Sequence, residues 1–429
     1  MGVSVAELRA GSLHSCVKRQ EGFYNEEAET MSADALRALQ ESFLGPLVQF
    51  SYENSSHYRA KMDEAGIKPA DVVHLEDLPK IPVTRKHETQ DLKFEGVMTV
   101  PYNKARRIFV SPGPQFYAYG PIPQEANPLL KVYHAIGFRP GDIVLNTFTY
   151  HFTPAGINFD ESLGAFGCAV IPAGPGQTDL QVDVLSKLAV TGYVGTPSFL
   201  TIIAERAREM GLDPRKDFSL EVALSTAESL PEQRRAELQE TYGMTVRQLY
   251  GSADGLMPCF ECWAADGMHI PEIMILEITD PATGAQLPAG EPGAVTASVF
   301  NPYRPLLRFS NGDRGVIIPE ACRCGRTALR MRFAGRIDEA AKVRGMFVYP
   351  EQIAEALERF GVVAAWRAVV SSDARGLDVL TVEVEGTLDD GARDKIADAV
   401  RAAVRVRADV VGVPSVSPDG PRLEDQRER

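Results

Sequence analysis

The stretch of sequence that decides the fold lies in the last third of the chain. It reads Asn301-Pro-Tyr-Arg-Pro-Leu-Leu-Arg-Phe-Ser-Asn-Gly-Asp-Arg314, then Cys322-Arg-Cys-Gly-Arg-Thr327, and then Gly335-Arg-Ile-Asp-Glu-Ala-Ala-Lys-Val-Arg-Gly-Met-Phe-Val-Tyr-Pro350. From residue 271 to residue 318 strands follow one another without helices, which predicts a small antiparallel sheet or barrel. Beyond Gly335 the pattern changes to strand, helix, strand, strand, helix, with the clearest strand at Gly376–Glu385. The run therefore predicts where one domain ends and a smaller one begins.

Upstream of that run, short apolar strands alternate with helical stretches. Such alternation is typical of a parallel, doubly wound sheet. Residues 1–100 are expected to be mostly helical, because Ala35–Leu44 spaces its apolar residues three and four apart. The predicted strands of the sheet are Asp142–Phe148, Gly167–Pro172, Tyr193–Pro197, Val222–Thr226 and Val246–Tyr250.

We therefore expect an α/β protein of two domains. The large N-terminal domain, residues 1–335, should hold doubly wound, mostly parallel sheets plus a small antiparallel subdomain. The small C-terminal domain, residues 336–429, should be a mobile α+β unit with a hinge near Arg336–Asp338. The polar tail Ser417–Arg429 is expected to be mobile.

Composition argues against several classes of partner. The chain has 429 residues and a net charge of −13, which disfavours nucleic acid and anionic membranes as partners. No apolar run approaches the roughly 20 residues that span a bilayer, and Met1–Glu7 shows no signal-peptide pattern. Six cysteines in so long a chain do not indicate a disulfide framework. We expect a cytoplasmic protein.

The order and spacing of several motifs resemble the phenylacetate–CoA ligase family of adenylate-forming enzymes, from about residue 80 to the end. Members of that family adenylate an acid with ATP; a small domain then rotates, and a thiol, usually coenzyme A, displaces AMP. The motifs are Ala169–Thr178, Thr196–Phe199, Ser225–Glu228, Tyr250–Asp254, Gly290–Val295, Arg308–Asp313 and the hinge signature Gly335–Pro350. The resemblance implies a catalytic role for Arg336 at the hinge, and nucleotide or coenzyme A binding by Glu228, Tyr250, Gly251, Asp254, Asp313, Lys342 and Arg344.

Three stretches depart from the family's pattern at the step that uses ATP. The phosphate loop corresponds to Arg107–Ala118, where Pro112 and Pro114 have no N–H to donate and where Phe116 and Tyr117 are expected to fill the phosphate space. Ala253-Asp254 replaces a Thr-Glu pair, which removes a phosphate contact and shortens the Mg²⁺ ligand, and Gln426 replaces a C-terminal lysine. Loss of such a charge contact costs on the order of 3 kcal/mol. We therefore expect ATP and Mg²⁺ to be dispensable.

These departures favour an acyltransferase with a ligase fold. It would move an aryl or arylacetyl group, such as anthraniloyl, benzoyl or phenylacetyl, from coenzyme A to a second thiol such as that of an acyl carrier protein. Two alternatives stay open, an ATP-dependent aryl or phenylacetate–CoA ligase and a pseudoenzyme that binds acyl-CoA. A homodimer is compatible with the resemblance, because dimers are common in the family.

The segment Tyr150-His151-Phe152 follows a predicted strand, where open α/β sheets bind ligands. Tyr150 and Phe152, together with Gly195 and Thr196, are expected to contact the acyl group. His151 could act as the base for an incoming thiol, or it could be a packed histidine. Cys168 could carry the acyl group, but its place in an apolar strand favours an inert core thiol.

A further pattern indicates a metal. Cys262 and His269 form one pair of soft ligands and Cys322 and Cys324 form a second. Four such ligands suit a closed tetrahedral zinc site with a structural role, and the resembling family shows the same pattern. Cys259 could replace one ligand, and reduced buried thiols are the alternative to a metal.

Overall fold

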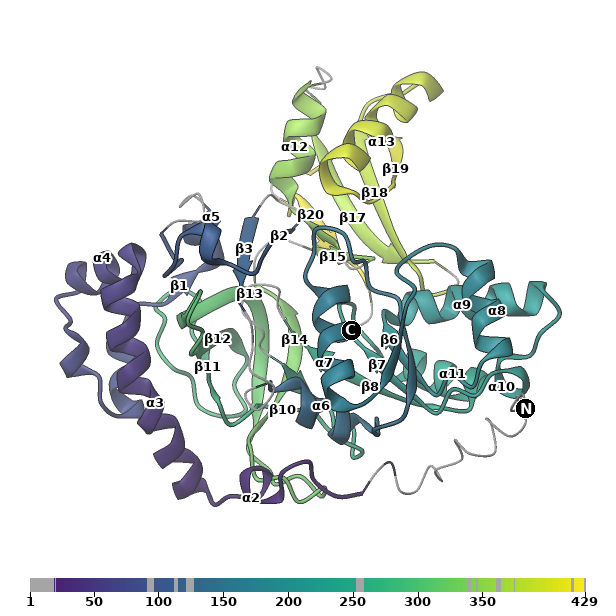
Figure 1. The fold of residues 1–429 in the computed structure, drawn as a ribbon. Helices are drawn as coiled ribbons and strands as arrows, with labels where there is room; N and C mark the ends of the chain where they lie inside the picture. The colour runs from purple at the N-terminus through teal and green to yellow at the C-terminus, as the bar shows by residue number, and fades with distance from the viewer. Residues whose placement is uncertain are drawn as a thin grey trace, which may run out of the picture.

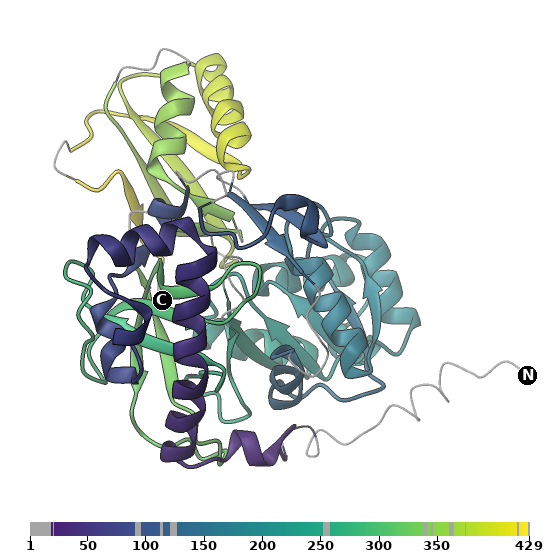
Figure 2. The same ribbon diagram turned by 60° about the vertical axis from the view of Figure 1, so that its left-hand side comes forward.

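A computed structural model describes most of the chain (Figure 1). The described residues form a large body, and the last quarter of the chain forms a smaller unit that stands on one side of it in both views (Figures 1 and 2). The described residues are 19, 21–90, 96–111, 115–120, 127–251, 258–337, 341–344, 346–359, 364–373, 375–417 and 420–427.

The N-terminal region is helical, as its apolar spacing predicts. Its longest element is α3, Ala33–Asn54, which begins where the Ser32 hydroxyl accepts the N–H of Ala35. Leu44 and Leu47 of α3 pack against Leu307, so these helices cover the antiparallel half of the body. The other elements of this region are α2 Glu26–Glu29, α4 Ser56–Glu64, η2 Pro69–Asp71, η3 Leu75–Lys80, β1 Thr84–Arg85, α5 Lys86–Gln90 and η4 Tyr102–Lys104.

The parallel half confirms the doubly wound prediction. Its strands pair in the order β5-β4-β6-β7-β8, all parallel, and neighbouring residues of one strand face opposite layers. Val144 packs with α6 and α7, whereas Leu145 packs with α8 and α9. The elements are α6 Leu129–Ile136, β4 Ile143–Asn146, α7 Ala155–Phe166, β5 Ala169–Pro172, α8 Thr178–Lys187, β6 Gly192–Gly195, α9 Pro197–Glu209, α10 Pro214–Asp217, β7 Val222–Ser225, α11 Glu232–Tyr242 and β8 Thr245–Tyr250.

The antiparallel strands are present, but they do not form a separate sheet. They continue the parallel sheet through β9, which pairs antiparallel with β8, so that one 12-stranded sheet runs through the body. Consecutive strands without helices between them predict antiparallel pairing, but they do not predict that the first of them pairs with the edge of the parallel sheet. The elements are β9 Cys259–Phe260, β10 Met268–His269, β11 Met274–Thr279, β12 Gly293–Val299, β13 Leu306–Ile318 and β14 Arg330–Arg336.

The smaller unit holds a hairpin and a four-stranded sheet of order β19-β18-β17-β20. The sequence predicted five of its eight described elements in the right order and missed β19, β20 and one strand of the hairpin. The division between residues 335 and 336 stays a prediction, since β14 runs to Arg336. The elements are β15 Ala341–Val343, β16 Met346–Val348, α12 Pro350–Arg359, β17 Trp366–Ser372, β18 Asp378–Glu385, α13 Asp390–Val404, β19 Ala408–Val413 and β20 Leu423–Asp425.

The expectation of a mobile tail is wrong for its second half. Residues Leu423–Asp425 form β20, which pairs in parallel with β17, and Leu423 is buried. The strand has one apolar residue among its three, so its sequence shows no alternation that could predict it. It is fixed by hydrogen bonds to the edge of β17.

The predicted phosphate loop is a β-hairpin of β2 Arg107–Ser111 and β3 Gln115–Tyr119. The connection between the two strands, which includes Pro112 and Pro114, lies outside the described residues. Among the described helices, none has the length and apolar character needed to cross a membrane.

Candidate active site

A cavity of about 1540 Å³ lies at the carboxyl ends of the parallel strands, where the smaller unit meets the body. Its walls come from segments far apart in the sequence. Residues that follow β4, β6, β7 and β8 line it from the body, and the β15–β16 hairpin, the start of β18 and the chain after β20 line it from the smaller unit.

One part of the cavity wall is aromatic. Phe148 and Phe159 stack with their ring centroids 5.4 Å apart, and Tyr117 and Tyr119 of β3 line the same cavity. Of the two aromatic residues expected in the phosphate space, Tyr117 is buried under the guanidinium of Arg304. Phe116 does not line the cavity and is 44% exposed, because adjacent strand residues face opposite sides of the hairpin.

Asp313 is the centre of a hydrogen-bond cluster that joins three strands. Its carboxylate accepts the hydroxyl of Tyr250 on β8 at 2.6 Å and the amide of Asn311 on β13 at 2.7 Å. Its other oxygen pairs with Arg336 on β14 at 2.7 Å. Asp313 and Arg336 are register partners, so the sheet itself places the two charges together. Burial, followed by the nearby Asp313 charge, raises the pKa of Tyr250 well above its usual range.

Glu228 faces the same cavity from the loop after β7. Its carboxylate accepts the N–H and the hydroxyl of Ser198 at 3.2 and 2.9 Å. Burial raises the pKa of Glu228 to about 7, the charge of Asp378 adds to the rise, and the Ser198 bonds and Lys342 oppose it. A carboxyl with this pKa exchanges its proton near neutral pH.

Lys342 approaches from the smaller unit on β15. Burial lowers the pKa of its amine to about 8. The carboxylates of Asp313 and Glu228 oppose that effect, whereas the positive charges of Arg336 and Lys86 support it. The pKa of Lys342 therefore depends on two carboxylates and two other cations that line the same cavity.

The end of the chain is anchored beside Lys342. The guanidinium of Arg427 pairs with Asp378 at 2.9 Å and with Asp425 at 2.7 Å, and it donates to the Lys342 carbonyl at 2.8 Å. Arg344 is exposed and donates its main-chain N–H to the carboxylate of Asp378. Gln426 lines the cavity, and its amide donates to Glu424 at 2.9 Å.

The structure brings together most of the residues expected to bind nucleotide or coenzyme A. Asp254 lies outside the described residues, as do Ala253 and Asp338. The members of that set that line the cavity are Glu228, Tyr250, Gly251, Asp313, Lys342 and Arg344. Thr196, expected to contact the acyl group, and Arg336, expected to be catalytic, line it as well.

The segment Tyr150–Phe152 does not line the cavity. The Tyr150 hydroxyl donates to Asp160 at 2.8 Å, His151 is exposed, and Phe152 is 70% exposed with φ 62°. Phe148, Thr149 and Thr153 line the cavity instead. Gly195 does not line it either; a side chain there would meet the Thr147 hydroxyl oxygen at 2.1 Å. Strand ends can be predicted, but the direction of a loop side chain cannot.

Sequence reasoning missed Lys86, Asn311, Phe148 and Arg427. Asn311 stands two residues before Asp313 on the same strand, and period-two spacing could have placed both on one face. No sequence pattern predicts Lys86 as a site residue, because its place at the cavity depends on the pairing of the preceding strand β1 with β13.

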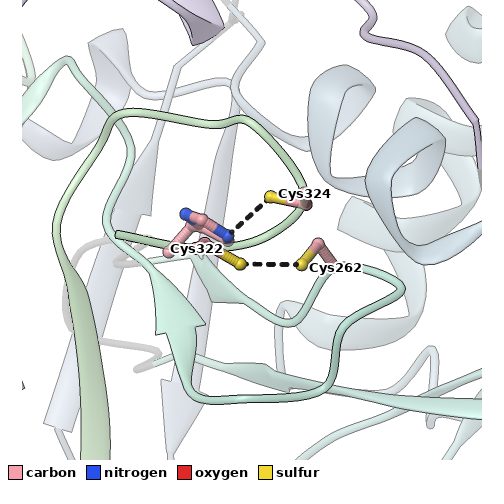
Figure 3. Close-up of side chains that lie close together, drawn as sticks. Cys262, Cys322 and Cys324 are labelled. Atoms are coloured by element: carbon pink, nitrogen blue, oxygen red, sulfur yellow. Dashed lines mark hydrogen bonds between the residues drawn. The ribbon is translucent and has the colours of Figure 1, made fainter. Parts of the chain in front are cut away.

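The predicted metal ligands converge on one point. One ligand atom from each of Cys262, His269, Cys322 and Cys324 lies within 4.8 Å of the others. The sulfurs of Cys262 and Cys322 are 3.7 Å apart (Figure 3), close to the roughly 3.8 Å expected for two thiolates on one tetrahedral zinc with Zn–S near 2.3 Å. His269 Nε2 lies 3.4 Å from the Cys324 sulfur. The four residues fit a zinc ion.

The two remaining described cysteines do not join this cluster. Cys259 is buried in the apolar core, and burial raises the pKa of its thiol well above the usual range. Burial also raises the pKa of Cys168 to about 12, and its thiol lies 3.6 Å from the carbonyl of Arg139. A thiol with so high a pKa is a poor nucleophile near neutral pH, which favours an inert Cys168.

Comparison with known proteins decides the family. The AMP-binding enzyme family model matches residues 126–299. Phenylacetate–coenzyme A ligase of Thermus thermophilus is 34% identical over 376 residues, which cover 84% of each chain. The chain belongs to the phenylacetate–coenzyme A ligase family. The enzyme of the same name from Escherichia coli is 30% identical over 370 residues, 83% of this chain and 84% of that one.

Solved structures confirm the fold. A 2-hydroxyisobutyryl-CoA ligase in its thioesterification state covers 100% of this chain and 96% of its own, with 24% identity and a TM-score of 0.87. The same ligase in its postadenylation state covers 97% and 93%, also with 24% identity, and gives 0.70. Fold and family together establish an enzyme of the acyl-CoA ligase superfamily.

The raised pKa of Glu228 predicts a pH-dependent loss of stability. The folded state holds this proton more tightly than the unfolded chain, whose carboxyl has the ordinary pKa of 4.5. Wild type should therefore lose stability as pH rises from 4.5 to about 7, and Glu228→Gln should not. Urea unfolding should show the variant gaining about 1–3 kcal/mol on wild type between about pH 5 and pH 8.

Glu240→Gln is the matched control for this experiment, because Glu240 is exposed. Its unfolding curves should follow those of wild type at both pH values. A difference between Glu228→Gln and wild type that does not change with pH would contradict the assigned titration.

Proposed function

We propose that the enzyme forms a thioester between an aromatic carboxylic acid and coenzyme A, with ATP as the activating substrate. The observation that carries this proposal is the cavity in which Glu228, Asp313, Arg336 and Lys342 meet beside an aromatic wall. The names of the relatives support phenylacetate and coenzyme A as the substrate classes.

The aromatic wall suits an aryl or arylacetyl group. The stacked pair Phe148 and Phe159 lines the cavity, and Tyr117 and Tyr119 line it from the β-hairpin. Burial of an aromatic ring against such residues is favourable in itself, and offset or edge contacts add about 0.5–1.5 kcal/mol. The carboxylate or thioester end of the substrate would then point toward the charged residues.

The charged residues suit a nucleotide. A carboxylate offers about four acceptor positions, and Tyr250, Asn311 and Arg336 occupy three of those on Asp313. The remaining position would accept a ribose hydroxyl. Arg336 and Lys342 would offset the negative charge of a phosphate, first of ATP when the substrate carboxylate attacks it and then of AMP when a thiol displaces it.

A second candidate is acyl transfer from coenzyme A to another thiol, such as that of an acyl carrier protein, without adenylation. The observation that favours it is Gln426, which is neutral, lines the cavity and stands where the family has a lysine. Pro112, Pro114 and Ala253 favour it on sequence alone. Both candidates share the attack of a thiol on an activated aryl carbonyl.

The two candidates differ in their need for ATP. With benzoate, phenylacetate or 2-aminobenzoate as the acid, and with ATP, Mg²⁺ and coenzyme A, we expect an aryl-CoA, AMP and pyrophosphate by mass spectrometry. A parallel assay supplies benzoyl-CoA and pantetheine without ATP. Product in the second assay alone would replace the ligase by the acyltransferase, and no product in either would overturn both.

Gln426→Lys sharpens this test, because it restores a cation where adenylation needs one. The variant should raise the rate of pyrophosphate release by roughly 10²-fold. Gln49→Lys adds the same charge at an exposed site on α3 and should change nothing. An unchanged rate in Gln426→Lys would show that the cavity stabilises the reacting phosphate without this residue.

We propose in addition that Cys262, His269, Cys322 and Cys324 bind a structural zinc ion. Its support is the convergence of the four ligand atoms, which leaves no open coordination position for a substrate. The ion would tie the turn before β10 to the loop between β13 and β14, beside the strands that carry Asp313 and Arg336.

Purified protein should accordingly contain about one zinc per chain by elemental analysis. Cys322→Ser should lose the metal and about 4 kcal/mol or more of unfolding free energy, since metal loss is among the largest single-residue effects. Cys168→Ser, outside the cluster, is the control and should keep the metal. A metal-free wild-type protein, or a Cys322→Ser variant as stable as wild type, would refute the zinc site.

A further inference from the structure

We propose that Lys342 is the base that takes the proton from the incoming thiol, and that strand β15 places its amine in the cavity for this step. The inference rests on the proposed thioester chemistry and assigns a residue to the thiol attack, which both candidate reactions share. Its evidence is the geometry of the β15–β16 hairpin and the charges that surround the amine.

The hairpin fixes the direction of the Lys342 side chain. Ala341 and Val343, on either side of it, are completely buried in the core of the smaller unit. Because successive strand residues point to opposite faces, Lys342 points away from that core, and it lines the cavity. Val343 pairs with Met346 and Ala341 with Val348, which holds the short strand in register.

Arg427 holds the same strand from the other side. Its guanidinium donates to the Lys342 carbonyl at 2.8 Å while Asp378 and Asp425 fix the guanidinium. The last described residue of the chain is therefore a positioning residue for β15. Movement of the smaller unit would carry Lys342 with it, because β15, β18 and Arg427 are linked by these contacts.

The charges that face Lys342 come from four elements of the body. They are Asp313 on β13, Arg336 on β14, Glu228 after β7 and Lys86 on α5. The two carboxylates raise the pKa of Lys342 and the two other cations lower it. Burial is the largest effect and lowers this pKa to about 8. A thiol has a pKa of about 8.5, so proton transfer to this amine is nearly balanced in energy, as general base catalysis requires.

Other bases in the cavity fit the step less well. No histidine is among the residues that line the cavity in the described part of the chain, and His151 is exposed outside it. Asp313 already accepts from Tyr250, Asn311 and Arg336. Glu228 is bound to Ser198 and loses its proton near neutral pH, so a neutral lysine is the stronger base.

The same proton transfer serves both candidate reactions. The neutral Lys342 amine takes the proton of the thiol, and the thiolate sulfur forms a bond to the aryl carbonyl carbon. The bond from that carbon to the AMP oxygen then breaks, or the bond to the sulfur of the donor thioester breaks in the acyltransferase. AMP leaves and the lysine proton passes to water, or the departing thiolate takes that proton.

The test isolates the thiol step. Chemically prepared benzoyl-adenylate with coenzyme A, and benzoyl-CoA with pantetheine, are each mixed with wild type, Lys342→Gln and Lys342→Arg. Lys395→Gln, at an exposed position on α13, is the control. Binding of benzoyl-CoA is measured by calorimetry, so that a variant that does not fold is recognised.

Lys342→Gln should slow thioester formation by about 10²- to 10⁴-fold. Lys342→Arg should be equally slow, because an arginine does not give up its proton. With 2,2,2-trifluoroethanethiol, which ionises more readily than coenzyme A, the loss in Lys342→Gln should shrink to less than about tenfold. The wild-type rate should rise with pH through about 8, whereas the rate of Lys342→Gln should follow only the ionisation of the thiol itself, near pH 8.5.

Three results would overturn the inference while leaving the proposed function intact. They are an unchanged rate in Lys342→Gln, an active Lys342→Arg, and a loss of rate that does not depend on the acidity of the thiol. A wild-type protein that makes no thioester in either assay would overturn the proposed function, and the inference would fall with it.

Discussion

The carboxylate of Asp313 holds the site together. It accepts hydrogen bonds from side chains on β8, β13 and β14, which belong to the parallel half, the antiparallel half and the approach to the smaller unit. Asp313 and Arg336 are each less than one tenth exposed, and removal of one partner from such a buried pair typically costs about 3–5 kcal/mol. The charges that would bind a nucleotide are thus also the charges that fix the junction of the sheet.

The Asp313–Arg336 pair lies where the body and the smaller unit meet, and each of these two parts supplies residues to one cavity. The body supplies Glu228 and the aromatic wall, whereas the smaller unit supplies Lys342 and the anchored Arg427. The carboxyl with the raised pKa, Glu228, belongs to the body, and the amine with the lowered pKa, Lys342, belongs to the smaller unit. Their meeting depends on how the smaller unit sits against the body, since residues of both line the cavity.

Much of the fold and the charged half of the site could be predicted from the sequence. The parallel strands, the long N-terminal helix and the Cys/His cluster follow from apolar periodicity and residue spacing. The order and spacing of the motifs that resemble the family predicted Asp313, Arg336 and Lys342 as site residues. The prediction failed where position depends on long-range pairing, as for β20, for Lys86 beside β13 and for the direction of Tyr150–Phe152.

A crystal structure of the protein with the phenacyl thioether of coenzyme A would locate both groups, since this compound holds an aryl ketone one methylene away from the sulfur and cannot transfer its acyl group. The proposed thiol attack requires the aryl ring against Phe148 and Phe159, and the sulfur on the side of the cavity that Lys342 lines. Occupation of any other site by the aryl group, or a sulfur remote from Lys342 with the cavity empty, would contradict it.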